Sequence, residues 1–223
     1  MQLDEVRGRL LAMSRPLPPP PRGIDARVVG RPGELPAWIR DAQSVPPRHA
    51  AALALIFPDE EGEAFIVLTE RPSGDLRHAG QISLPGGRVD PGDDFPVGTA
   101  LREAREEVGL DAEAAGVEVM GTLDVVDVRV SGFLLTPVVA VARRAPALVP
   151  HPREVASIIL APISAFLPDA PIEIVDAARD GFRLRYGAYP VQGHQVWGAT
   201  ARVLGQLGAV LGLPYQGSPS ASS

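Results

Sequence analysis

The chain has 223 residues, 45% of them hydrophobic, which suffices for one well-buried domain. Its formal net charge of -6 argues against a nucleic-acid-binding surface, which needs a basic footprint. The lack of cysteine excludes disulfides, cysteine–zinc sites and cysteine nucleophiles, and it fits a reducing cytoplasm. No secretory leader opens the sequence and no apolar run approaches the roughly 18 residues that span a bilayer. We therefore expect a soluble cytoplasmic protein with no membrane or nucleic-acid partner.

The first part of the chain is predicted to form an arm outside the main domain. Apolar residues recur at helical spacing within residues 1–14, which predicts a short amphipathic helix. The proline run at 17–21 predicts an extended linker. We expect a helical and proline-rich arm over residues 1–48, one domain over 49–213, and a disordered tail over 214–223.

Strand and helix patterns alternate irregularly through the domain. A continuous apolar run at 49–57 predicts a strand buried on both faces, and 64–69 predicts its hairpin partner. The other elements expected along the chain are helices at 96–108 and 199–211, two or three strands in 117–141, and a strand with a short helix in 155–167. Because a regular βαβ rhythm is missing, we expect an α/β fold with a mixed β-sheet flanked by helices.

The sequence around residues 96–108 contains start and stop signals of a helix. Pro96 suits the first turn, and Asp93 and Asp94 precede that turn, where negative charge is favoured. Gly109 is placed to act as a left-handed C-terminal cap. The face expected to be buried consists of Val97, Leu101, Ala104 and Val108.

Three carboxylates share another part of this helix surface. Glu103, Glu106 and Glu107 fall within a fan of roughly 100°, because successive residues turn by about 100°. Carboxylates so close repel one another, and a bound Mg²⁺ or Mn²⁺ removes the conflict by taking their oxygens together with water and substrate phosphate. Arg102 lies one turn before Glu106 and can hold it. A solvated acidic helix face is the alternative.

The segment from the Gly86-Gly87 loop to Leu110 resembles the signature of the Nudix hydrolase superfamily, Gly-x5-Glu-x7-Arg-Glu-U-x-Glu-Glu-x-Gly-U, with U apolar. Residues 102–110 match its second half at every position. Six residues, not five, separate Gly87 from the acidic position that keeps the spacing to Arg102, and that position holds Asp94 instead of glutamate. A one-residue insertion is tolerable because loop closure costs rise slowly with length. The resemblance implies a Nudix-type α/β/α sandwich.

The same resemblance implies roles for residues of the signature. Glu103, Glu106 and Glu107 would ligate Mg²⁺ or Mn²⁺, with the Gly87 carbonyl as a further ligand, and Arg102 would orient a glutamate. The metal would polarise a diphosphate and lower the pKa of a bound water.

Two residues are candidates for the base that deprotonates the attacking water. Glu103 is one, and superfamily members often take this residue from a loop outside the signature. Glu154, which follows His151-Pro152-Arg153, is the loop candidate. Its alternative interpretation, a surface charge before a strand, remains open.

A second resemblance lies upstream, over residues 67–87. This stretch is similar to the segment that marks the coenzyme A pyrophosphatase branch, with Leu84 where phenylalanine is usual. Residues 196–201 are similar to the ending of that branch. The resemblance implies that the substrate is bound by Arg71, Arg77, His78, Gly80 and Gln81.

The arginines and the histidine of this set can each contact a phosphorylated ligand. Coenzyme A carries a diphosphate and a 3′-phosphate, so Arg71 and Arg77 can pair with oxygens left free by the metal. His78 can donate a hydrogen bond to a phosphate or can fix its loop. Trp197 fits a core anchor at a helix start better than an adenine-stacking face.

These resemblances imply hydrolysis of coenzyme A or acyl-CoA to 3′,5′-ADP and 4′-phosphopantetheine by a monomer or homodimer. ADP-ribose or another nucleoside diphosphate derivative is the alternative substrate. NADH is disfavoured, because Nudix enzymes acting on it commonly carry a four-cysteine zinc module. A non-catalytic nucleotide sensor is a third possibility, although such proteins usually lose a signature glutamate.

Overall fold

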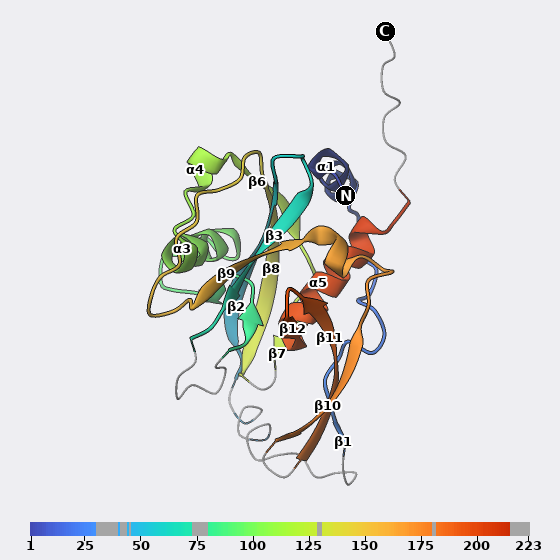
Figure 1. The fold of residues 1–223 in the computed structure, drawn as a ribbon. Coiled ribbons are helices and arrows are strands. Elements are labelled where there is room, and N and C mark those ends of the chain that lie inside the picture. The colour runs from blue at the N-terminus through green and yellow to red at the C-terminus, as the bar shows by residue number, and fades with distance from the viewer. Residues whose placement is uncertain are drawn as a thin grey trace.

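Strand β2 (Arg48–Pro58) lies at the centre of the main sheet (Figure 1). Its side chains alternate between two apolar cores, with Leu53 and Leu55 in one and Ala54 and Ile56 in the other. The strand predicted at 49–57 and its burial on both faces are therefore confirmed. The computed structural model describes residues 1–29, 40, 44, 46–72, 80–128, 131–179 and 182–214.

The main sheet is mixed, as predicted. Strand β2 pairs in parallel with β8 (Phe133–Ala142) and antiparallel with its hairpin partner β3 (Ala64–Glu70). The shorter strands of the sheet are β4 (Ile82–Ser83), β5 (Gly86–Arg88), β6 (Val117–Thr122), β7 (Val126–Val128) and β9 (Ser157–Pro162). Strands β6, β7 and β8 fill the region where two or three strands were predicted.

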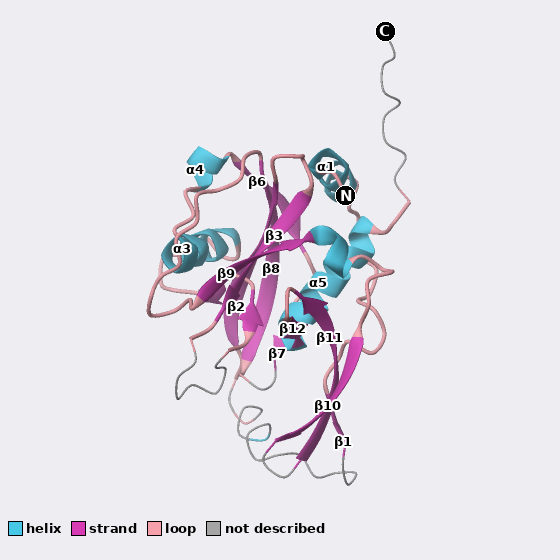
Figure 2. Ribbon diagram, viewed as in Figure 1, coloured by secondary structure: helices cyan, strands magenta, loops and turns pink. Residues whose placement is uncertain are grey.

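Helices cover both faces of this sheet (Figure 2). Helix α3 (Val97–Val108) packs on the face that buries Leu53 and Leu55. Helices α1 (Leu3–Leu11) and α5 (Gly198–Leu211) pack on the opposite face. The short helices are α4 (Ala112–Ala115) and the 3-10 turn η1 (Ile163–Phe166). This arrangement confirms the α/β/α sandwich.

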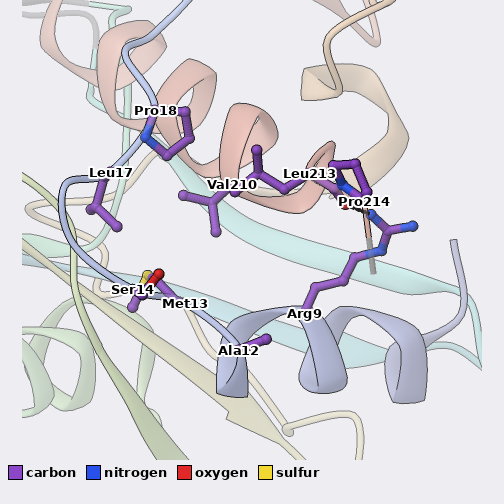
Figure 3. Close-up of a pocket in the computed structure, with 9 residues that line it drawn as sticks. All are labelled: Arg9, Ala12, Met13, Ser14, Leu17, Pro18, Val210, Leu213 and Pro214. Atoms are coloured by element: carbon purple, nitrogen blue, oxygen red, sulfur yellow. Dashed lines mark hydrogen bonds between the residues drawn. The ribbon is translucent and has the colours of Figure 1, made fainter. Parts of the chain in front are cut away.

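The N-terminal arm packs on its own chain. Val6 and Leu10 of α1 are buried in the core that α5 completes. Arg9 donates hydrogen bonds of 2.6 and 2.5 Å to the carbonyls of Leu211 and Leu213, at the end of α5. Figure 3 shows this arginine reaching from α1 toward the end of the described chain, beside a small cavity of about 70 Å³. The arm therefore closes one edge of the sandwich.

A second, antiparallel sheet projects beside the sandwich and was not predicted (Figure 1). It consists of β1 (Arg27–Val29), β10 (Glu173–Arg179), β11 (Phe182–Val191) and β12 (His194–Trp197). Strand β1 comes from the segment that we expected to be only helix and linker, and it pairs with β11. Trp197 stacks on Tyr186 with ring centroids 4.6 Å apart, so the packing interpretation of Trp197 is confirmed.

In the part of the chain that the structure describes, no helix is long and apolar enough to cross a membrane. Most of the tail predicted to be disordered, from residue 215 onward, lies outside the described residues.

Candidate active site

Helix α3 begins and ends close to the predicted positions. Pro96 directly precedes the helix, and Gly109 ends it with a φ of 67°, in the left-handed region that glycine tolerates. The buried face differs in part from the prediction. Ala104 and Val108 are fully buried as expected, whereas Val97 and Leu101 are only partly buried. The other buried side chains of the helix are Thr99, Ala100 and Glu107.

Arg102 organises the loop and the helix. Its guanidinium makes a two-pronged contact with Asp93 at 3.0–3.3 Å and donates to the Arg88 carbonyl at 2.9 Å. It also forms 3.0 Å ion pairs with Glu103 and Glu106. A longer ion pair of 3.7 Å joins Arg102 to Asp90. The predicted contact between Arg102 and Glu106 is therefore present, and Arg102 joins four carboxylates.

The acidic position of the loop is Asp93, and the assignment to Asp94 is wrong. Asp93 accepts hydrogen bonds from Arg102, from the Thr99 hydroxyl at 2.9 Å and from the Asp90 backbone N–H at 3.0 Å. The Arg102 contact holds the pKa of Asp93 far below its usual range. Five residues separate Gly87 from Asp93. The extra residue of this chain therefore falls between the acidic position and the helix, and the spacing from glycine to acid is kept.

Glu107 is a buried carboxylate beside the glycine loop. Its side chain is 9% exposed and accepts a 3.1 Å hydrogen bond from the Gly86 backbone N–H. Burial raises the pKa of Glu107 to about 7, and the charges of Glu103 and Glu154 act in the same direction, while Arg71 opposes them.

Glu103 lies directly against Gly87. A side-chain carbon at Gly87 would collide with the Glu103 carboxylate, so only glycine permits this approach. Burial raises the pKa of Glu103, although its ion pair with Arg102 works against that shift. The Glu103 carboxylate therefore lies beside the Gly87 backbone, and the metal-ligand roles of these two residues stay a prediction.

The three glutamates differ in exposure and partners. The Glu106 side chain is half exposed, and among the described residues it pairs with Arg102. No three acidic or histidine side chains within the described ranges are arranged to hold a metal ion as they stand. Arg102 instead neutralises Glu103 and Glu106, so an arriving cation would compete with it.

Glu154 lies on a turn that is tied to the end of α3. The His151 backbone N–H donates to the Glu107 carbonyl at 2.8 Å, and the Glu154 N–H donates to the His151 carbonyl at 3.0 Å. The His151 imidazole lies 3.7 Å from the Glu154 carboxylate. Glu154 is half exposed and close enough to Glu107 to influence its charge. This placement keeps the loop residue within electrostatic reach of the signature.

A cavity of about 460 Å³ opens beside the glycine loop. The signature contributes Gly86, Gly87, Arg88 and Glu103, and the upstream segment contributes Arg71, Gln81, Ser83 and Leu84. Its other side is formed by strands β2, β7 and β8 and by the first turn of α5. The volume falls in the range of small-molecule sites.

The upstream segment reaches this cavity through backbone pairing. The Arg71 N–H donates to the Gln81 carbonyl and the Gly80 N–H donates to the Arg71 carbonyl, both at 3.1 Å. These bonds place Arg71 and Gln81 together on the cavity wall. Gly80 holds the turn with a φ of 69° and does not line the cavity. Arg77 and His78 lie outside the described residues.

Several cavity residues were missed from the sequence. Arg88 could have been found, since it follows the Gly-Gly pair directly. Phe133, Val128 and Leu135 carry no chemical signal of their own, because apolar strand residues usually indicate only core. They reach the cavity through the pairing of β2, β7 and β8.

Comparison with known proteins agrees with this geometry. The family profile described as the NUDIX domain matches residues 47–172. The uncharacterized Nudix hydrolase NudL of Photorhabdus laumondii is 37% identical over 160 residues, which cover 72% of this chain and 83% of that protein. Nudix hydrolase 15, mitochondrial, of Arabidopsis thaliana is 32% identical over 173 residues, which cover 74% of this chain and 59% of that protein.

Among solved structures, the Nudix hydrolase RenU of M. smegmatis is 28% identical with a TM-score of 0.45, covering 54% of this chain and 73% of that chain. The profile match spans more than half of the chain, and it contains the glycine loop, helix α3 and the Glu154 turn. The chain therefore belongs to the Nudix hydrolase family.

Proposed function

We propose that this chain hydrolyses the diphosphate linkage of coenzyme A or acyl-CoA and releases 3′,5′-ADP and 4′-phosphopantetheine. The observation that supports the proposal best is the shared cavity. Glu103 and Gly87 of the signature line the same space as Arg71 and Gln81 of the upstream segment. Residues of both resemblances thus line one cavity.

Nudix hydrolases generally use a divalent metal such as Mg²⁺ or Mn²⁺, and the donors of this chain suit one. Glu103, Glu106 and Glu107 would supply carboxylate oxygens and Gly87 a carbonyl, which are the hard ligands that these cations take. The close approach of the Glu103 carboxylate to the Gly87 backbone supports this ligand set. A bound metal would neutralise charge that builds up on the diphosphate and lower the pKa of a water molecule.

The chain's own residues would position the reactants. Arg71 would pair with phosphate oxygens. Glu103 or Glu154 would accept the proton of the attacking water, whose oxygen bonds to one phosphorus while the bridging P–O bond breaks. Arg102, fixed by Asp93, would keep Glu103 and Glu106 in place.

The proposed partners are small molecules, and the proposed location is the cytoplasm. The presence of all three signature glutamates favours an enzyme over a non-catalytic sensor. A monomer or a homodimer is compatible with the proposal.

Hydrolysis assays with Mg²⁺ on coenzyme A, ADP-ribose, NADH and diadenosine polyphosphates test the substrate. We expect the highest kcat/KM for coenzyme A, with 3′,5′-ADP as a product. A higher kcat/KM for ADP-ribose would contradict the substrate assignment and leave the glutamate helix intact. No turnover of any compound would favour the sensor.

A further inference from the structure

One wall of the active-site cavity is a sheet face that the signature does not include. Side chains alternate along a strand, so Arg48, Ala50 and Ala52 of β2 share one face. In the parallel pairing with β8, Arg48 lies opposite Phe133 and Ala50 lies opposite Leu135. Ala50, Ala52 and Phe133 line the cavity. The small alanine side chains leave the cavity open along β2. Phe133 forms its far rim, and Arg48 lies outside the lining residues, against the Phe133 ring.

This wall extends from the catalytic loop toward Phe133. Strand β5 pairs with β2 so that Gly86 lies opposite Ala52 and Arg88 opposite Ala50. Phe133 lies opposite Arg48, four residues along β2 from Ala52. At a rise of about 3.3 Å per residue, the rim is roughly 13 Å from the glycine loop. That length accommodates a ribose and a base beyond the diphosphate.

The far rim combines an aromatic ring with a cation. The Arg48 guanidinium lies 4.4 Å from the centre of the Phe133 ring, and Arg48 is otherwise exposed. Arg88 also lines the cavity. It lies opposite Ala50, two residues along β2 from Arg48 toward the glycine loop. Among the described residues, no carboxylate forms an ion pair with Arg48 or Arg88. Two cations that have no acidic partner in the described part of the chain therefore flank an aromatic and apolar wall, although the net charge of the chain is -6.

We propose that this rim is a nucleotide subsite, in which the purine base packs on Phe133 and a phosphate outside the diphosphate is held by Arg48 and Arg88. Aromatic rings and guanidinium planes stack on bases, and arginine forks match phosphate oxygens. The apolar residues Val128 and Leu135 complete the base pocket. The inference rests on the proposed function, because coenzyme A is the candidate substrate that has a 3′-phosphate next to its adenine.

Product binding tests the subsite without catalysis. Isothermal titration of the full chain with 3′,5′-ADP and with AMP should show tighter binding of 3′,5′-ADP. Arg48→Ala should weaken 3′,5′-ADP binding by about tenfold or more and leave AMP nearly unchanged, because a charge-assisted contact is lost. Phe133→Leu should weaken both ligands, since it removes the ring and keeps the apolar bulk. An unchanged preference in Arg48→Ala would overturn the proposal.

Arg143→Ala is the matched control. Arg143 is exposed and follows the opposite end of β8, roughly 30 Å from Phe133 at the usual strand rise. It should bind both ligands as the wild type does. Thermal unfolding of each variant shows whether it is folded, and Arg48→Lys, which keeps the charge, should recover part of the 3′,5′-ADP affinity.

Kinetics separate this inference from the proposed function. The wild type should have a higher kcat/KM for coenzyme A than for dephospho-coenzyme A, and Arg48→Ala should remove that difference. Equal values for the two substrates in the wild type would overturn the subsite and leave coenzyme A hydrolysis standing. Preferential binding of 3′,5′-ADP without coenzyme A turnover would support the subsite and overturn the proposed function.

Discussion

Glu107 shows how one buried carboxyl group makes stability depend on pH. Its pKa is raised to about 7 by burial, while the same residue in the unfolded chain ionises near 4.5. Between these values the unfolded chain is charged and the folded chain is still protonated. Stability of the metal-free protein therefore falls as the pH rises from about 4.5 to about 7, and remains lower above that pH.

We predict that Glu107→Gln stabilises the metal-free protein at pH 8 but not at pH 4. The gain at pH 8 should be at most about 3 kcal/mol, since each pKa unit corresponds to about 1.4 kcal/mol. Urea unfolding in the presence of a chelator at both pH values measures it. Equal destabilisation of Glu107→Gln at pH 8 and at pH 4 would show that burial does not raise the pKa of Glu107 in the folded protein.

Asp93 and Asp94 form a matched pair for testing the corrected signature. Asp93 holds Arg102 and Thr99, whereas the carboxylate of Asp94 makes no hydrogen bond within the described residues. Asp93→Asn should lower kcat by roughly 10- to 100-fold, the usual cost of losing a residue that orients ligands. Asp94→Asn should retain nearly wild-type activity. The reverse order would restore the assignment made from sequence spacing.

At the scale of elements, the sequence predicted helix α3 well and its loop less well. Periodic apolar residues and the Gly109 cap define the helix within a residue or two. The register of the loop could not be read from spacing, because the contact between Arg102 and Asp93 depends on how the extra residue is folded. The raised pKa of the Glu107 carboxyl group could not be read from the sequence either, because it comes from burial in the folded chain.

The second sheet was missed for a different reason. Strand β11 shows alternation in its first half, from Phe182 to Tyr186, but Gly187 and Pro190 interrupt the pattern. Strand β1 is three residues long and has no signal of its own. Strand β1 becomes a strand through its pairing with β11, which lies far away in the sequence, and this is a tertiary effect. Strand β11 also pairs with β10 and β12.

The helix α1 is predicted to stabilise the sandwich through Leu10. Leu10 is 1% exposed and Leu11 is 60% exposed, so the two neighbours form a direct comparison. Leu10→Ala should cost about 2–5 kcal/mol, as deletions in packed cores do. Leu11→Ala should change stability by less than about 0.5 kcal/mol. Equal, small effects in urea unfolding would mean that the arm does not pack on the domain.

At the scale of the whole molecule, the family and the α/β/α sandwich were predictable because the helix motif is long and specific. The cavity could not be predicted from the sequence, because its residues come from the signature, from the upstream segment and from strands β2 and β8. These two strands pair with Arg48 opposite Phe133. The pairings of β5 with β2, of β2 with β8 and of β7 with β8 bring these parts together.

The most direct test of the central claim is a titration of coenzyme A hydrolysis with Mg²⁺, in the wild type and in Glu103→Gln and Glu107→Gln, with 3′,5′-ADP release as the readout. We predict saturable, metal-dependent activity in the wild type, none in excess chelator, and a kcat lower by orders of magnitude in both folded variants. Full activity in either variant, or activity that survives the chelator, would contradict the account.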